Sequence, residues 1–169
     1  MKTIQRAALL LALLWSAMLS ANETELPSIP AVSSPVQGIV TAGRLDADNV
    51  RSVHEAGIRH VIDLTLDEET PDFDEAAAVR DAGMRYSNLP VQGASGLTLK
   101  NVQAFDTLLR ESERPVLVHC SSSNRVGAMA ALRAAWMEGK TMEEAIAIGK
   151  EWGLRGLEDE VRRRIDARF

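Results

Sequence analysis

Residues 115 to 130, PVLVHCSSSNRVGAMA, contain the chain's single cysteine, Cys120, and an arginine five positions later, Arg125. An apolar run precedes the cysteine, three serines follow it, and almost every residue after the arginine is apolar. This pattern predicts a buried strand, a tight loop of small residues, and a helix that begins at the loop. Because the free N–H groups and the positive dipole end at a helix start attract anions, we expect an oxyanion site here.

The thiol, the loop backbone and the guanidinium would act on the same anion. The residues whose backbone N–H groups can form the anion-binding nest are Ser121, Ser122, Ser123 and Asn124. The same positive field favours the thiolate form of Cys120, and the fork of Arg125 can hold two oxygens of the anion. Phosphoryl transfer needs positioning and charge stabilisation above all, so attack by the cysteine would give a phosphocysteine that water hydrolyses. The alternative for a lone cysteine is an inert core residue.

Short apolar runs alternate with helical periodicity along the rest of the chain. The expected strands cover residues 39–42, 59–64, 84–91 and 115–119, and the expected helices cover 46–56, 73–82, 98–111, 126–138, 141–152 and 157–167. The predicted fold class is therefore α/β, with a mostly parallel central sheet of about four or five strands, flanking helices and a helical C-terminal third. In such sheets ligands bind beyond the carboxyl ends of the strands, which is where the cysteine loop begins.

The N-terminal segment is typical of a secretory signal peptide. Lys2 and Arg6 precede an apolar run over residues 7–19, which is shorter than the roughly 20 residues that span a bilayer. We expect cleavage after Ala21, export to the periplasm without stable membrane association, an extended lead-in over residues 22–36, and one domain over 37–169. The formal net charge of −5 gives no general reason to bind nucleic acid.

Residues 38 to 152 resemble the protein tyrosine and dual-specificity phosphatase superfamily, most closely its bacterial beta-lactamase-hydrolase-like, phosphatase-like family. The stretches that carry the resemblance are GIVTAGRLDADNV, AGIRHVIDL, AGMRYSNLPV, PVLVHCSSSNRVGA and GKTMEEAIAIGKEWG. The resemblance implies the cysteine-dependent phosphatase fold, with Cys120 as nucleophile, Arg125 as phosphate clamp and His119 as a residue that stiffens the loop. It also implies a phosphorylated small molecule or a phosphoprotein as substrate.

Three features depart from the superfamily pattern. Four residues separate Cys120 from Arg125, whereas conventional members have five, and four is also a spacing of rhodanese-type sulfurtransferases. Val126 replaces the usual Ser or Thr, and the loop over residues 91–98, where the family carries its general acid, has no carboxylate. We therefore expect slow turnover. A persulfide carrier and a non-catalytic phosphate-binding module remain as alternatives.

An acidic segment between residues 67 and 74 is the upstream source of carboxylates that could replace the missing acid. We select Asp67 as the candidate general acid, against the alternative of a solvated acidic loop. Asp63, inside an apolar strand, is expected to be a buried, hydrogen-bonded orienter. His54 and His60 have no second ligand at metal spacing, so neither a metal nor another cofactor is expected. The sequence does not indicate an oligomeric state.

Overall fold

The computed structural model describes residues 26–168. The expected signal peptide lies outside the described residues, so export stays a prediction. Within the described part, no helix is both long enough and apolar enough to span a membrane.

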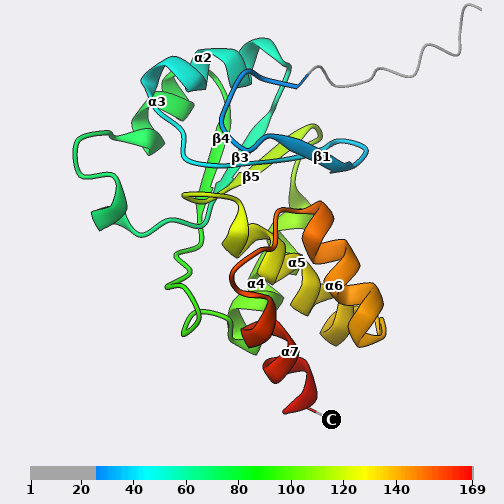
Figure 1. The fold of residues 1–169 in the computed structure, drawn as a ribbon. Helices are drawn as coiled ribbons and strands as arrows, with labels where there is room; N and C mark the ends of the chain where they lie inside the picture. Colours follow the sequence, from blue (N-terminus) through cyan, green and yellow to red (C-terminus); the bar gives the residue numbers. More distant parts are fainter. Residues whose placement is uncertain (1–25, 169) are drawn as a thin grey trace, which may run out of the picture.

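A five-stranded sheet runs through the centre of the molecule in the order β1-β2-β5-β3-β4 (Figure 1). The strands are β1 Ser33–Val36, β2 Ile39–Ala42, β3 His60–Asp63, β4 Arg85–Asn88 and β5 Val116–His119. Strand β1 pairs antiparallel with β2, and every other pairing is parallel. The predicted α/β class with a mostly parallel sheet is confirmed.

The segment expected to be a lead-in contributes the edge strand β1. Val36 pairs with Ile39, and Gly38 between them has a φ of 76°, a left-handed conformation that suits a two-residue hairpin turn. Ile29, further upstream, is 8% exposed and belongs to the core. Residues of the expected lead-in therefore take part in the sheet and the core. The short polar sequence of β1 did not reveal the strand, because its backbone pairing with β2 defines it.

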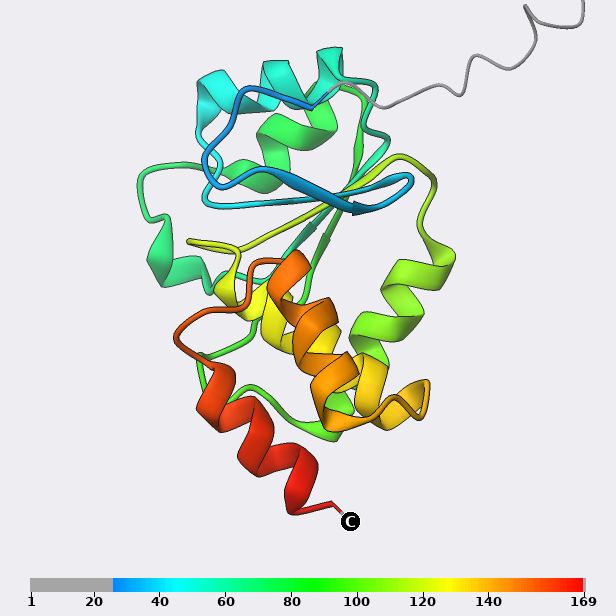
Figure 2. The same cartoon turned by 45° about the vertical axis from the view of Figure 1, so that its right-hand side comes forward.

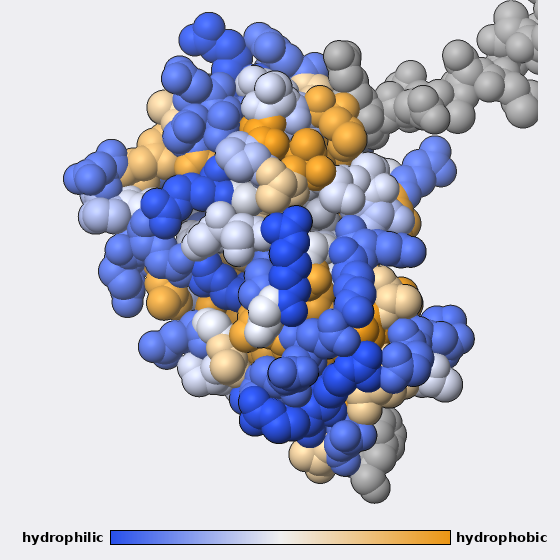
Figure 3. All heavy atoms as spheres, in the orientation of Figure 1, coloured by the Kyte–Doolittle hydropathy of each residue, from blue (hydrophilic) through white to orange (hydrophobic). Residues whose placement is uncertain are grey.

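Helices cover both faces of the sheet (Figures 1 and 2). Helices α2 (Ala47–Glu55) and α3 (Glu75–Asp81) lie on one face, and α4 (Leu99–Glu111), α5 (Asn124–Met137) and α6 (Met142–Glu151) lie on the other, with α7 (Glu158–Asp166) packed outside α5 and α6. Alternate residues of β5 enter the two cores: Leu117 packs on the α2 side, whereas Val116 and Val118 pack on the α5 side. Hydrophilic side chains cover the region of α7 in Figure 3.

We call α2 and α3 the first helical layer and α4 to α7 the second. Helix α5 is the buried helix of the second layer, and at Gly127 its backbone meets α6 without an intervening side chain. A Cβ built on Gly127 would lie 2.0 Å from the backbone nitrogen of Leu154 and 2.6 Å from the carbonyl oxygen of Gly149. The backbone that follows the cysteine loop is therefore held directly against the segment after α6.

We predict that Gly127→Ala destabilises the protein by at least about 2 kcal/mol, because the added methyl meets backbone that cannot rotate away. Thermal unfolding followed by circular dichroism measures this loss. Gly156→Ala is the matched control, since the nearest atom to its added Cβ is 3.8 Å away on Asn124. Equal melting temperatures for the two variants would contradict the close packing.

Candidate active site

The cysteine loop forms the predicted strand, turn and helix. Strand β5 ends at His119, the chain turns through Cys120 to Ser123, and α5 begins at Asn124, two residues before the predicted start. Ser123 has a φ of 63°, and this left-handed residue directs the chain into the helix. The sulfur-bearing residue Cys120 is only 1% exposed, so it lies beneath the loop rather than on the surface.

Neighbouring segments hold the loop on several sides. The Ser123 hydroxyl donates a 3.0 Å hydrogen bond to the carbonyl oxygen of Trp152, and Asn124 Oδ1 accepts one of 2.8 Å from the backbone N–H of Arg155. On the sheet side, the backbone N–H of Arg44 donates to the carbonyl oxygen of Ser121 over 3.2 Å. Because α5 starts here, the N–H groups of its first turn have no acceptor inside the helix and remain suited to an anion.

The guanidinium of Arg125 lies where the ends of two parallel strands meet the loop. Its Nη1 donates to the carbonyl oxygens of Leu64, directly after β3, and Val91, shortly after β4, over 3.3 and 3.0 Å. Burial lowers the pKa of Arg125, but the hydrogen bond and charge of Glu69 and the adjacent Cys120 outweigh burial and raise it. The guanidinium therefore stays cationic beside the sulfur.

Glu69 forms an ion pair with the two terminal nitrogens of this guanidinium. Its two carboxylate oxygens accept hydrogen bonds of 2.6 Å each from Nη1 and Nη2 of Arg125, and the Ser121 hydroxyl donates to Glu69 while accepting from Nη2 over 2.7 Å. The hydrogen bond from Arg125 is the main reason that the pKa of Glu69 falls to about 2. Among residues 26–168 the oxygen acceptors of this guanidinium all bond to Nη1 or Nη2, and its remaining neighbour is the sulfur of Cys120, so Nε can face an oxyanion held at the sulfur.

An open hollow of about 340 Å³ lies over the loop. The residues around it are Leu66, Glu69, Gly93, Ser121, Ser122, Asn124, Arg125 and Leu157. Four of the predicted phosphate-binding residues thus come together at one mouth. The fifth, Ser123, is buried and bonded to Trp152, so it contributes to the shape of the loop rather than to the lining.

The acidic segment contributes Glu69 to this mouth, whereas the selected acid, Asp67, is exposed and lines a different hollow. Glu69 closes a short 3-10 turn, η1 (Asp67–Glu69), in which its carboxylate also accepts from the backbone N–H of Leu66 over 2.9 Å. The sequence indicated the segment, but the turn that selects Glu69 has no periodic signal. The role of Asp67 as an acid stays a prediction.

A buried network surrounds His119, the residue before Cys120. His119 Nε2 lies 2.7 Å from Glu75 Oε1 and 3.5 Å from Asp63 Oδ1. Asp63 in turn accepts hydrogen bonds from Thr65 and from the hydroxyl of Tyr86, the latter over 2.8 Å. Asp63 is therefore buried and hydrogen-bonded, as predicted. Glu75 was not singled out, because at the start of an exposed-looking helix a glutamate resembles an ordinary first-turn residue.

We predict that the Glu69–Arg125 pair makes stability depend on acid pH. A carboxyl whose folded pKa is lowered stabilises the fold above its unfolded pKa, near 4.5, and loses that contribution as the pH falls toward about 2. Chemical denaturation from pH 6 to 2 should show Glu69→Gln losing about 1 to 3 kcal/mol relative to wild type at pH 6, with the difference shrinking at low pH. The neighbour Glu68→Gln is the control. A pH-independent difference would contradict the ion pair.

Known proteins resemble this chain in sequence. The family description "Beta-lactamase hydrolase-like protein, phosphatase-like domain" matches residues 35–137. The Beta-lactamase hydrolase-like protein of Xylella fastidiosa is 32% identical over 119 residues, which are 68% of this chain and 27% of that protein. The chain thus spans about a quarter of the length of this relative.

Solved structures share the fold. A phosphatase candidate from Neisseria meningitidis has a TM-score of 0.69 at 22% identity, with 81% of this chain and 97% of that chain covered. A variant of Pseudomonas aeruginosa TpbA in complex with phosphotyrosine has a TM-score of 0.51 at 18% identity, with 87% and 99% covered. The resemblance found in the sequence is confirmed: the chain belongs to the beta-lactamase hydrolase-like, phosphatase-like domain family.

Proposed function

We propose that the chain is a cysteine-dependent phosphatase that hydrolyses phosphomonoesters, with aryl phosphates as the favoured class. The observation that carries the proposal is the guanidinium of Arg125, held by Glu69 and two carbonyl oxygens beside Cys120 at the start of α5. A permanent cation, the N–H groups of a helix start and a sulfur nucleophile then surround one position. Membership of a phosphatase-like family supports the same reaction class.

The reaction would proceed in two displacements. The sulfur of Cys120 attacks phosphorus, the S–P bond forms, and the ester P–O bond breaks with its electron pair on the leaving oxygen. Water then attacks phosphorus, the S–P bond breaks, and inorganic phosphate leaves. Arg125 Nε and the loop N–H groups stabilise the charge on the transferred phosphoryl oxygens in both steps. In the structure Arg125 Nη2 donates a hydrogen bond to the Ser121 hydroxyl. This bond must break before Nε and Nη2 can together hold two phosphoryl oxygens.

The leaving group decides how fast the first step runs. Glu69 is the carboxylate at the mouth, and its low pKa, near 2, leaves it without a proton to donate at neutral pH. Without a general acid the leaving oxygen departs as an anion, which costs an alkoxide roughly 10²- to 10⁴-fold in rate and a phenolate much less. The phosphotyrosine bound to the TpbA variant is a ligand of the favoured aryl class.

We predict that the protein releases phosphate from an aryl phosphate at least about 10²-fold faster than from an alkyl phosphate of the same charge. Phosphate release under reducing conditions measures both rates. Similar rates on the two substrates would show that a general acid operates, and would bring Asp67 back as the residue to mutate.

We predict that Cys120→Ser abolishes turnover and that Arg125→Lys lowers kcat/KM by at least about 10²-fold, because a lysine cannot provide the planar fork. Arg44→Lys is the matched control. Arg44 also contacts the loop through its backbone, but its side chain is exposed. Turnover by Cys120→Ser would contradict the proposal.

Two results would replace the phosphatase proposal with one of the two alternatives, the persulfide carrier indicated by the four-residue spacing or the binding module indicated by the missing acid and Val126. A stable sulfur adduct on Cys120 after exposure to thiosulfate, without phosphatase activity, would indicate a persulfide carrier. Phosphate binding by calorimetry without turnover on any phosphomonoester would indicate a binding module.

A further inference from the structure

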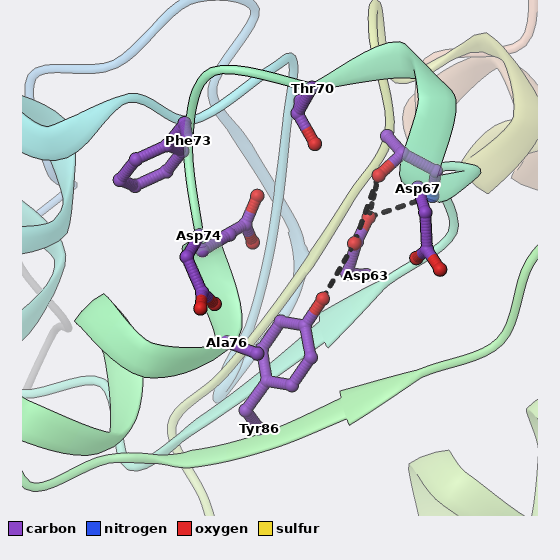
Figure 4. A pocket seen from close by; sticks show the side chains of 9 residues that line it. Asp63, Asp67, Thr70, Phe73, Asp74, Ala76 and Tyr86 are labelled. Atoms are coloured by element: carbon purple, nitrogen blue, oxygen red, sulfur yellow. Dashed lines mark hydrogen bonds between the residues drawn. The ribbon is translucent and has the colours of Figure 1, made fainter.

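A second hollow, of about 200 Å³, is lined by residues between Asp63 and Ala76 and by Tyr86. Its lining is strongly acidic. Four carboxylates line it, those of Asp63, Asp67, Asp74 and Glu75, and no basic side chain does. Figure 4 shows the labelled Asp63, Asp67 and Asp74 around it, with the hydroxyl of Tyr86 bonded to Asp63. The phosphatase reaction described above makes no use of this hollow.

Three buried side chains, two of which line the hollow, lie close together with the separations of a shared coordination sphere. One ligand atom each from Asp63, Glu75 and His119 lies within 4.8 Å of the other two. The His119 imidazole is the nitrogen donor, and its Nε2 is 2.7 Å from Glu75 Oε1. One imidazole and two carboxylates are a donor set for ions such as Mn²⁺ and Zn²⁺.

An independent observation is a buried oxygen without a partner. The Glu75 side chain is 3% exposed, and its Oε2 has no hydrogen-bond partner among the described residues. A buried carboxylate oxygen without a donor is costly, and Glu75 lines the hollow, from which a cation can supply the missing interaction.

The surroundings suit a cation. Hydrogen bonds from Thr65, Tyr86 and Asn88 orient the Asp63 carboxylate, as outer-shell donors do around metal-binding carboxylates. Asp67 and Asp74 supply further negative charge at the walls. Arg80, whose guanidinium lies over the ring of Tyr86 at 5.3 Å from the centroid, does not line the hollow.

We propose that this hollow binds one divalent transition-metal ion of the Mn²⁺ or Zn²⁺ class, through Glu75, Asp63 and Nε2 of His119. Binding replaces the hydrogen bond between Nε2 and Glu75, and any proton carried by Nε2 leaves to solvent. The proposal is independent of the phosphatase activity. This proposal departs from the expectation, drawn from the sequence, that the chain holds no metal; His54 and His60, the residues on which that expectation was based, take no part in the site.

Isothermal titration of the chelator-stripped full chain with Mn²⁺, Zn²⁺, Mg²⁺ and Ca²⁺, each alone, tests the site. We expect one Mn²⁺ or Zn²⁺ per chain, with affinity reduced at least about 10-fold in Glu75→Gln. Cys120→Ser should bind normally, which excludes the thiol as the ligand. Asp72→Asn is the matched control, because it removes an exposed carboxylate of the same segment.

A second measurement covers the case in which Glu75→Gln fails to fold. Electron spin echo spectroscopy of Mn²⁺ bound to the wild-type chain should show coupling to an imidazole nitrogen, and the coupling should persist in His54→Gln. Absence of Mn²⁺ and Zn²⁺ binding, binding that is equally strong in folded Glu75→Gln, or bound Mn²⁺ without imidazole coupling would each overturn the proposal. Binding of Mg²⁺ or Ca²⁺ without binding of Mn²⁺ or Zn²⁺ would also overturn the proposal, because it would indicate only a solvated acidic surface.

Discussion

One ion pair, between Arg125 and Glu69, determines what the cysteine loop can do. An arginine beside a buried sulfur would otherwise have many rotamers, most of which point its charge into water. Two bonds of 2.6 Å to Glu69 and further bonds to strand-end carbonyl oxygens leave the guanidinium one orientation. Nε, which bonds to none of these oxygens, then remains available to a ligand. The short loop needs this constraint, because four residues offer fewer N–H groups to position an anion.

The groups of the site come from both layers of the fold. The second layer supplies the loop and α5, and Gly127 lets that helix sit directly against the segment after α6. The first layer supplies Glu75 of α3, which reaches His119 at the end of β5. The central sheet connects the layers, because β3 and β5 are paired in parallel and end at the same edge with Asp63 opposite His119. Sheet register therefore brings together residues that are distant in sequence.

Much of this arrangement was predictable from the sequence. Alternating apolar runs and helical periodicity predicted the four parallel strands and six helices within a few residues. The loop was predictable because its chemistry is local, from Cys120 to Arg125.

The features that could not be predicted depend on contacts across the chain. Glu69 and Asp67 differ by two positions in a polar turn, and only the fold determines which carboxylate reaches Arg125. Glu75 reads as a first-turn residue, although it is 4% exposed and bonded to His119. Strand β1 consists of SSPV, whose composition does not indicate a strand.

The central claim is that Cys120 carries the phosphoryl group during turnover. Rapid acid quench of the protein mixed with an aryl phosphate, followed by mass spectrometry of the peptide that contains Cys120, tests it most directly. The account predicts a phosphoryl adduct on the sulfur within the first turnover, enriched because Val126 offers no hydroxyl to assist departure of the thiolate from the intermediate. Phosphate release without any adduct on Cys120 would contradict the account.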